Sequence, residues 1–289
     1  LHGKSFIPMV MGFGCNVPAI MATRTIENRK SRLITMLIIP LMSCAGRMPV
    51  YVLIAGAFFP RNAGLVVLGL YALGIVLAVI AAKVMSFFFK EDDLPFVMEL
   101  PPYRVPTAKS VFRHTWEKGR QYLQKMSGII LVCSMAIWFL GYFPNHDAYD
   151  SVKEQQEHSF IGYVGKAMEP VLEPLGFDWR MGVGIVAGVG AKELVVSTLG
   201  VMYVDEVEGA SSAPSGETRL QRALVRSVTP AAALAYMVFI LLYFPCIATF
   251  VAIKNEGGGW KWAIITAVYT IFLAWIAAFV TFRLASLFL

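Results

Sequence analysis

Residues 63–82 read AGLVVLGLYALGIVLAVIAA, and no side chain in this run is charged. About 20 apolar residues in a helix cross the hydrocarbon core of a bilayer, which is roughly 30 Å thick. The bilayer core offers the backbone no hydrogen-bond partners, so a run of this kind is stable there as a helix. We therefore predict a membrane-spanning helix over residues 63–82.

Stretches of similar length and composition lie on both sides of that run. The chain of 289 residues is 57% hydrophobic and only 15% charged, whereas soluble domains carry roughly a quarter charged residues. The predicted fold is all-α, a polytopic transmembrane helical bundle with broken or re-entrant helices. The other predicted apolar segments are 33–59, 126–143, 181–203, 228–253 and 262–282.

The net charge of +6 is carried unevenly by the segments between these runs. Residues 24–32 contain four Lys/Arg and one acid, and residues 83–125 contain eight and five. Residues 144–179 contain two Lys/Arg and seven acids. Cytoplasmic loops of membrane proteins are enriched in Lys and Arg, so we expect the first two segments in the cytoplasm and the third outside. This distribution argues against a basic face that binds nucleic acid.

A short pattern occurs twice in the chain. Residues 12–16 read GFGCN, and a long apolar segment with Cys44 inside it follows. Residues 188–193 read GVGAKE, and a second long segment with Cys246 directly after Pro245 follows. Glycine-interrupted segments at matching positions of two halves indicate a transport site at the interface between repeats. Chance recurrence among glycine-rich membrane helices is the alternative.

Cys15 is the first candidate ligand for a transported metal ion. Gly12 and Gly14 allow the backbone before it to unwind, and Pro18 disrupts the helix after it. Unwound backbone that lines a cavity exposes carbonyl oxygens, and a thiolate beside carbonyls suits a borderline or soft divalent metal. The adjacent Asn16 belongs to the same candidate set. The alternative role of Cys15 is that of a small apolar residue at a tight helix contact.

Two further cysteines stand in a similar context, because each lies near a helix breaker inside an apolar segment. These are Cys44 and Cys246, the latter directly after Pro245. Cys133 lies in an uninterrupted apolar run, so packing is its expected role.

Lys192 and Glu193 place two opposite charges in the middle of the segment 181–203. Charged groups at membrane depth are costly and usually face a polar cavity or a partner. Glu193 is a candidate for neutralising a passing cation, and Lys192 for holding another helix or setting the resting charge. The alternative is a structural tie to a partner such as Arg47 or a backbone carbonyl. Arg47 itself is expected to be a structural anchor.

Signatures of catalysis or nucleotide binding are not found in the sequence. Gly3-Lys4-Ser5 resembles the end of a phosphate-binding loop, but the residues after it form a broken apolar segment. An intramembrane enzyme would need a nucleophile paired with a base, and the predicted apolar segments contain no histidine or aspartate. We expect no catalytic residue and no cofactor bound by this chain. A structural or signalling subunit is a further alternative.

Five stretches closely resemble one family of membrane proteins. The first, which contains GFGCNVPAIMATR, is highly specific for the ferrous iron transport protein B (FeoB) family, and the resemblance covers nearly the whole chain. The stretches are LHGKSFIPMVMGFGCNVPAIMATRTIENRKSRL at 1–33, SCAGRMPVYVLIAGAFFP at 43–60, MELPPYRVP at 98–106, AKELVVSTLG at 191–200 and YFPCIAT at 243–249.

The resemblance implies that the chain transports Fe²⁺ as its substrate across the bacterial inner (plasma) membrane. It implies metal-handling roles for Cys15, Cys44 and Cys246, and Glu193 stands in the matching AKE motif. The sequence has Ala45-Gly46 where the family commonly has Ser-Ala before the arginine. A permease for nucleosides or other solutes is the alternative, because the gate regions of this family resemble those of such carriers.

The resemblance also implies a division into two gate-like membrane units. Residues 1–90 are expected to form the first, with broken helices, and 91–125 a cytoplasmic connecting segment. Residues 126–289 are expected to form the second, including an external loop at 144–179. The chain is expected to be the C-terminal part of the membrane domain.

The expected partners are implied by the same resemblance. They are the lipid bilayer, an N-terminal GTPase and membrane region that binds GTP and Mg²⁺, small Feo accessory proteins and a second copy of the chain. The sequence leaves the topology after residue 180 open. If the segment 181–203 crosses the membrane, the C-terminus is cytoplasmic, and if it is re-entrant, the C-terminus is outside.

Overall fold

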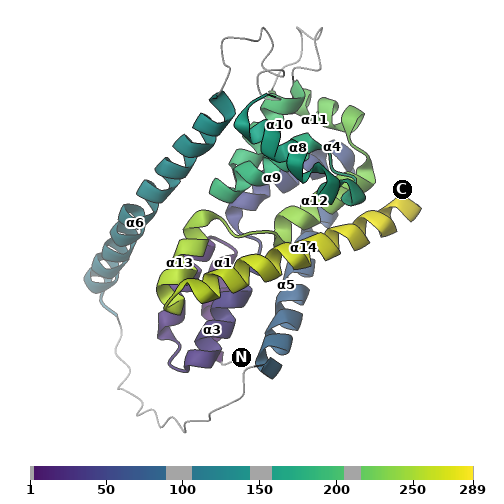
Figure 1. Cartoon of the computed structure of the whole chain (residues 1–289). Coiled ribbons are helices and arrows are strands. Elements are labelled where there is room, and N and C mark those ends of the chain that lie inside the picture. The colour runs from purple at the N-terminus through teal and green to yellow at the C-terminus, as the bar shows by residue number, and fades with distance from the viewer. Residues whose placement is uncertain (1–2, 89–105, 144–157, 205–215, 289) are drawn as a thin grey trace.

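The computed structural model describes residues 3–88, 106–143, 158–204 and 216–288 (Figure 1). Within these ranges the regular elements are helices, and no strand occurs. The expected connecting segment and external loop lie partly outside the described residues. Four helical stretches are long and apolar enough to cross a membrane, namely Arg29–Phe58, Ala63–Phe88, Pro230–Gly257 and Trp260–Leu287. They correspond to four of the runs that the composition predicts, so the chain is a multi-pass membrane protein.

The first half of the chain contains two short helices, an interrupted long helix and a continuous one. The interruption follows Pro40, whose ring cannot continue the helical hydrogen-bond pattern, and the 3₁₀ helices η3 and η4 flank it. These elements are α1 (Phe6–Gly12), α2 (Asn16–Ala22), α3 (Arg29–Ile38), η3 (Ile39–Leu41), η4 (Ala45–Arg47), α4 (Met48–Phe58) and α5 (Ala63–Phe88).

Helices α1 and α2 form a re-entrant hairpin. Lys4 precedes α1 and Glu27 follows α2, and the Lys4 Nζ lies 3.1 Å from Glu27 Oε1. Near the start of α1, Ser5 accepts a hydrogen bond from Thr35 of α3 at 2.9 Å. The two ends of this segment therefore lie at the same side of the bundle, and the tip at residues 13–15 points into it. We call α1–α2 hairpin 1.

The second half repeats this order of elements. Asp178 caps the start of α9 by accepting from the Met181 N–H at 2.9 Å. The hydroxyl of Tyr203, near the end of α10, donates to the same carboxylate at 2.8 Å, so α9 and α10 form a second re-entrant hairpin, hairpin 2. The elements are α9 (Trp179–Gly190), α10 (Leu194–Val204), α11 (Gly216–Ser227), α12 (Pro230–Leu242), α13 (Ile247–Gly257) and α14 (Trp260–Phe288).

The re-entrant hairpins of the two repeats enter the bundle from opposite ends. At one end, Glu256 of α13 binds Arg24 and Arg32, which lie at the base of hairpin 1 and the start of α3. At the other end, α11 packs against α4, where a side chain at Gly56 would lie 3.3 Å from the amide nitrogen of Gln221. Hairpin 2 leads into α11, so its base lies at this second end. The repeats are therefore inverted relative to each other, as in many transporter folds.

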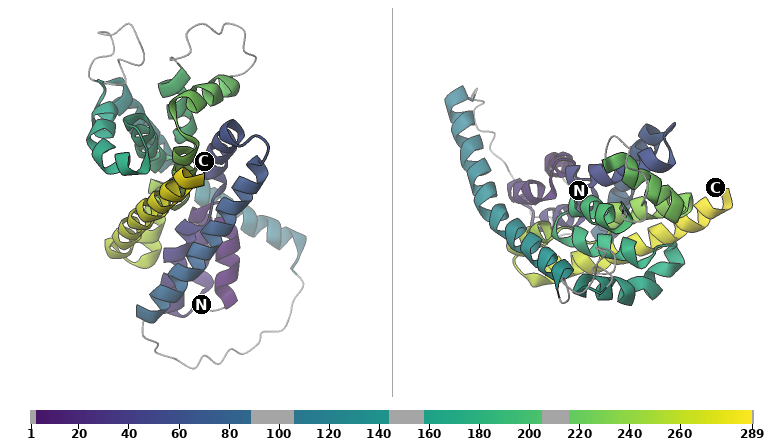
Figure 2. Two further views of the ribbon diagram at one scale, coloured as in Figure 1. Left: turned by 90° about the vertical axis from the view of Figure 1, so that its right-hand side faces the viewer. Right: turned by 90° about the horizontal axis from the view of Figure 1, so that it is seen from above.

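Reciprocal packing holds the repeats together. Helix α2 of the first repeat packs against α13 of the second, and α10 and α11 of the second pack against α4 of the first. Figure 1 shows α4, α10 and α11 gathered at one end of the molecule and α3 at the other, and Figure 2 shows the same division from the side. The main core of buried apolar side chains lies between the repeats, with α12 almost entirely buried at its centre.

Helix α6 (Ala108–Tyr142) links the two repeats. It begins at Ala108, two residues after Pro106, and Thr107 before it has an extended backbone. Its bounds place residues 108–125 in one continuous helix with the predicted span at 126–143. Figures 1 and 2 show α6 at the margin of the bundle, where it contacts α8 (Phe160–Leu172), α9 and α13.

Candidate cation site at the junction of four broken helices

Four interruptions of helical backbone meet in the middle of the bundle. They are residues 13–15 at the tip of hairpin 1, 42–46 between α3 and α4, 191–193 at the tip of hairpin 2, and 243–246 between α12 and α13. We call these four segments the junction.

Direct contacts connect the four segments. The Gly14 carbonyl accepts a hydrogen bond from the Ala45 N–H at 3.0 Å, which joins the first segment to the second. Lys192 Nζ donates to the Phe244 carbonyl at 2.7 Å, which joins the third to the fourth. A Cβ atom built on Gly46 would lie 2.8 Å from Glu193 Oε1, so hairpin 2 also lies against the second segment.

Backbone angles confirm the repeat that the sequence pattern predicts. Cys15 has φ −149° and ψ 133°, and Ala191, its counterpart in the pattern, has φ −146° and ψ 136°. Cys44 and Cys246 likewise have extended ψ values of 161° and 153°, and each directly precedes a helix. The backbone at each cysteine is therefore extended, and the carbonyl groups just before the cysteine lie outside the helical hydrogen-bond pattern.

The three candidate cysteines are half-buried at the junction. Cys15 and Cys246 pack against the same apolar cluster, which includes Val17, Ile20 and Met36. The Cys246 Sγ lies 3.1 Å from the Thr249 hydroxyl oxygen. Cys44 lies at the start of η4, two residues before Gly46, where a built Cβ atom would lie 3.5 Å from Lys192 Cβ.

Lys192 lies at the centre of the junction. Its side chain is buried, and its ammonium group lies 3.3 Å from the centroid of the Tyr243 ring. A cation above an aromatic face is attracted by the quadrupole of the ring. A Cβ atom built on Gly46 would lie 3.5 Å from Lys192 Cβ, so the segment that follows Cys44 packs against the Lys192 side chain, and the buried Arg47 guanidinium in that segment acts on the ammonium as a like charge. The structural tie to a backbone carbonyl, one of the roles considered for Lys192, is therefore present, and it connects hairpin 2 to the segment that holds Cys246.

Arg47 supports the junction from the first repeat. It is fully buried, and its Nη1 and Nη2 donate to the carbonyls of Met42 and Pro40 at 2.8 and 3.1 Å. These carbonyls are exposed because the helix stops at this point, and the guanidinium replaces the missing backbone donors. Arg47 is thus a structural anchor of the unwound segment, as the sequence predicts.

Three buried polar atoms at the junction have no hydrogen-bond partner within the described residues. They are Asn16 Oδ1, the Tyr243 hydroxyl and Arg47 Nε. Buried polar groups in native proteins are nearly always paired with protein or water. Unpaired acceptors beside Cys15 and beside Lys192 mark positions where water or a cation would be stabilised.

The predicted residues converge on one place but do not form a finished metal site. No group of three or more His, Cys, Asp or Glu side chains comes together in a metal-binding arrangement in the part of the chain that the structure describes. Glu193 is exposed at the tip of hairpin 2, and Asn16 is buried. Gly14 and Pro245 lie in the predicted helix breaks, and Gly12 is the last residue of α1. The expectation that Pro18 disrupts the helix is wrong, because Pro18 lies in the first turn of α2, where the missing N–H has no intrahelical partner to lose.

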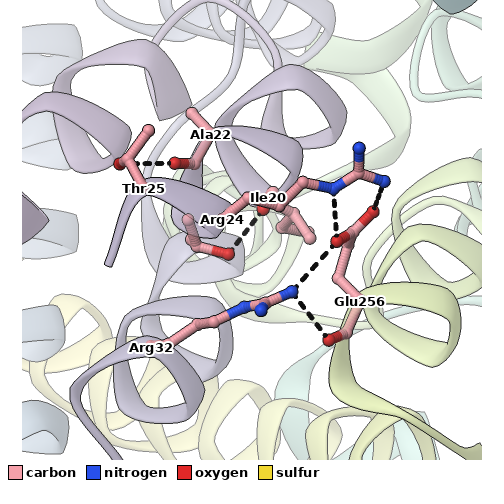
Figure 3. Close-up of polar contacts among 7 residues, drawn as sticks. Ile20, Ala22, Arg24, Thr25, Arg32 and Glu256 are labelled. Atoms are coloured by element: carbon pink, nitrogen blue, oxygen red, sulfur yellow. Dashed lines mark hydrogen bonds and ion pairs between the residues drawn. The ribbon is translucent and has the colours of Figure 1, made fainter. Parts of the chain in front are cut away.

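Sequence reasoning missed two features of the site. One is Tyr243, whose ring holds the Lys192 ammonium, and its only signal is its place directly before Phe244-Pro245-Cys246. The other is the ion pair between the repeats shown in Figure 3, where Arg24 and Arg32 both bind Glu256. We call these three residues the Arg24–Arg32–Glu256 cluster.

Inverted repeats with re-entrant hairpins and unwound crossing helices define a class of polytopic membrane domain. The Gate family, described as nucleoside recognition, matches residues 1–58 and 123–260. The family of the ferrous iron transport protein B C terminus matches residues 67–118. The chain belongs to the Gate family and carries the C-terminal FeoB segment within it.

Curated relatives are FeoB proteins. A fusion of Fe(2+) transport protein A with Fe(2+) transporter FeoB from Porphyromonas gingivalis is 52% identical to this chain. The match covers the whole of this chain and 38% of the fusion protein. The Fe(2+) transporter FeoB of Staphylococcus aureus is 42% identical, also over the whole chain and over 42% of its own length. That of Campylobacter jejuni is 39% identical over 48% of its length. The chain thus spans less than half of these relatives, and no solved structure matches it significantly.

Proposed function

We propose that this chain is the membrane permease region of a ferrous iron transporter and that Fe²⁺ passes through the junction. The observation that carries the proposal is that the segments holding Cys44, Cys246 and Glu193 meet around Lys192 at four helix breaks. The names of the relatives support Fe²⁺ as the substrate.

The chemistry of the junction fits a borderline divalent metal. Thiolates with imidazole, carboxylate or carbonyl groups bind Fe²⁺ and its neighbours in the first transition row, whereas Mg²⁺ and Ca²⁺ prefer oxygen alone. The half-buried sulfurs of Cys15, Cys44 and Cys246 supply the soft ligands. The amide oxygen of Asn16 is a buried acceptor without a donor among the described residues. Binding to thiols releases protons, so Fe²⁺ affinity falls as the pH falls.

The proposed orientation follows from the loop charges together with the two hairpins. Residues 24–32 are rich in Lys and Arg and are placed in the cytoplasm. Glu256 contacts Arg24, so the end of α13 is on the cytoplasmic side as well. Because hairpin 2 is re-entrant, the segment 204–227 lies outside with the acidic loop, and the C-terminus is outside. Full crossing by residues 181–203 would place Glu256 on the opposite side from Arg24.

The partners of the permease are also proposals. The relatives are longer than this chain, and we infer that the rest of such a protein includes a GTP- and Mg²⁺-binding region that controls the junction from the cytoplasm. The fusion protein of Porphyromonas gingivalis joins a transport protein A to its transporter. We infer that a separate small accessory protein of that kind binds this chain in the bacterial inner membrane, and that copies of the chain associate.

Uptake of radiolabelled Fe²⁺ by cells that express the protein tests the proposal. Cys15→Ser, Cys44→Ser, Cys246→Ser and Glu193→Gln should each lower uptake at equal membrane expression. Cys133→Ser, in the continuous helix α6, is the matched control and should retain normal uptake. Normal uptake by all four junction variants would remove the junction from the path of iron.

A nucleoside permease is the second candidate, and the match to the Gate family favours it. Proteoliposomes that contain the protein separate the two candidates. If the proteoliposomes take up radiolabelled uridine, excess Fe²⁺ does not affect that uptake, and Fe²⁺ itself is not taken up, the protein is a nucleoside carrier. Fe²⁺ uptake that excess uridine does not affect would identify an iron carrier.

A further inference from the structure

Both unwound crossing helices expose a carbonyl two residues before their cysteine. In the first repeat this is the carbonyl of Met42, before Cys44, and it accepts from Arg47 at 2.8 Å. In the second it is the carbonyl of Phe244, before Cys246, and it accepts from Lys192 at 2.7 Å. Each repeat therefore pairs the equivalent carbonyl with a buried protein cation.

The two cations are attached differently. Arg47 follows Cys44 by three residues on the same helix, and its second nitrogen binds Pro40, so it moves with the carbonyl that it caps. At the equivalent place in the second repeat the chain has Thr249, which is uncharged and contacts Cys246. The cation of the second repeat comes from hairpin 2 instead. A movement of that hairpin would uncover the Phe244 carbonyl, whereas no movement between elements would uncover that of Met42.

The Lys192 ammonium stands where a transported cation would be most stable. It has a carbonyl at 2.7 Å and an aromatic face at 3.3 Å, and Cys246 follows that carbonyl by two residues. A Cβ atom built on Gly46, two residues after Cys44, would lie 2.8 Å from Glu193 Oε1 and 3.5 Å from Lys192 Cβ. The buried Arg47 guanidinium opposes a further positive charge here. A second cation cannot join it there without strong like-charge repulsion in a region of low dielectric constant. The ammonium also keeps the part-buried Phe244 carbonyl satisfied when no metal ion is present, which avoids the cost of an unpaired acceptor.

We propose that Lys192 is a tethered cation that fills the iron site in the resting state, and that Fe²⁺ binds by displacing it with the tip of hairpin 2. This inference rests on the proposed function of the junction. The tether gives Lys192 a high effective concentration at the site. Weakly bound monovalent cations therefore do not replace it, whereas a divalent ion that binds the thiols does. Hairpin 2 is thus the moving element, and hairpin 1, held to Ala45 by the Gly14 carbonyl, is the fixed one.

Equilibrium binding of Fe²⁺ to the purified protein under anaerobic conditions tests the proposal. Lys192→Met keeps the length of the side chain but removes the charge and the donor. Because the competing ammonium is gone, Fe²⁺ should bind about tenfold or more tightly than to the native protein. Lys254→Met is the matched control, since Lys254 also lies over an aromatic ring, the indole of Trp260 at 4.0 Å, but at the end of α13. It should leave the affinity unchanged.

If Lys192→Met binds Fe²⁺ with the same affinity as the native protein, or more weakly, the tethered-cation role of Lys192 is overturned. Absence of Fe²⁺ binding to the native protein would instead contradict the proposed function, so the two failures are distinguishable.

The native protein provides a second measurement in case the variant does not fold. Acetylation of Lys192, followed by mass spectrometry, should increase when Fe²⁺ is added, while acetylation of Lys254 stays constant. Equal protection of Lys192 with and without Fe²⁺ would overturn the proposal.

Discussion

Arg24 and Glu256 lie 232 positions apart in the sequence, and Arg24 Nε donates to Glu256 Oε2 at 2.7 Å (Figure 3). Arg32 reaches the same carboxylate oxygen at 3.1 Å, and the Glu256 side chain is only 8% exposed. The hydrogen bond to Glu256 raises the pKa of Arg24. This contact fixes the base of hairpin 1, in the first repeat, to the end of α13, in the second.

Glu256→Gln should destabilise the protein by about 2 kcal/mol. The amide cannot accept charge-assisted hydrogen bonds from both arginines, and bonds to charged groups are worth about 1.5–3 kcal/mol each. The Arg24 side chain is 48% exposed, so solvent screens its charge. The loss of stability should therefore lie toward the lower end of the range for two such bonds. Thermal unfolding in detergent measures it. Glu27→Gln breaks only the exposed pair with Lys4 and should cost less than about 1 kcal/mol. Equal losses for both variants would show that the Arg24–Arg32–Glu256 cluster does not hold the repeats together.

Gly188→Ala should weaken the packing of hairpin 2. A Cβ atom at Gly188 would overlap the Tyr243 hydroxyl, and it would lie 2.5 Å from the Val195 side chain. Overpacking of this kind costs about 1–3 kcal/mol, so we expect a lower unfolding temperature and lower Fe²⁺ uptake. The same substitution at Gly69 in α5 meets no atom within 4 Å, and it should stabilise that helix by up to about 1 kcal/mol. Tolerance of alanine at Gly188 would contradict the close approach of hairpin 2 to Tyr243.

Tyr243→Phe should leave the protein as stable as before or raise its stability by about 1 kcal/mol. The substitution keeps the ring that contacts Lys192 and removes a buried hydroxyl that has no partner within the described residues. Tyr236→Phe is a suitable comparison, because the Tyr236 hydroxyl donates to the Met181 carbonyl at 3.3 Å. That variant should lose about 1 kcal/mol in chemical or thermal unfolding. A larger loss for Tyr243→Phe would mean that its hydroxyl has a partner, such as a bound water.

Labelling of introduced cysteines should confirm the re-entrant path of hairpin 2. Cysteines at positions 173 and 226 flank the hairpin and should both react with a membrane-impermeant maleimide added to intact cells. A cysteine at position 254, at the end of α13, should react only after the membrane is opened. Reaction of positions 173 and 226 from opposite sides would show that residues 181–203 cross the membrane.

The sequence contained enough information to predict the helix breaks but not their meeting point. Proline and glycine act locally, so Pro40, Pro245 and the Gly-x-Gly pairs marked the interruptions that the structure shows. The path of hairpin 2 was undecidable from composition, because its apolar run is long enough to cross or to return. Contacts between distant residues decide it, such as Asp178 with Tyr203.

The role of Lys192 could likewise be predicted from the sequence only in part. Its position inside an apolar run indicated a buried charge with a partner or a cavity. Its hydrogen bond to the Phe244 carbonyl spans 52 positions, and its contact with the Tyr243 ring depends on the unwound end of α12. Neither partner can be identified from spacing, because both depend on how the inverted repeats pack.

Anomalous scattering at the iron edge, from crystals of the protein grown anaerobically with Fe²⁺, tests the central claim most directly. We predict a peak at the junction, within bonding distance of the sulfurs of Cys44 and Cys246, with the Lys192 ammonium withdrawn from the Phe244 carbonyl. A peak confined to the acidic residues of 158–179, away from the junction, or a junction that contains no iron while Lys192 still binds Phe244, would contradict it.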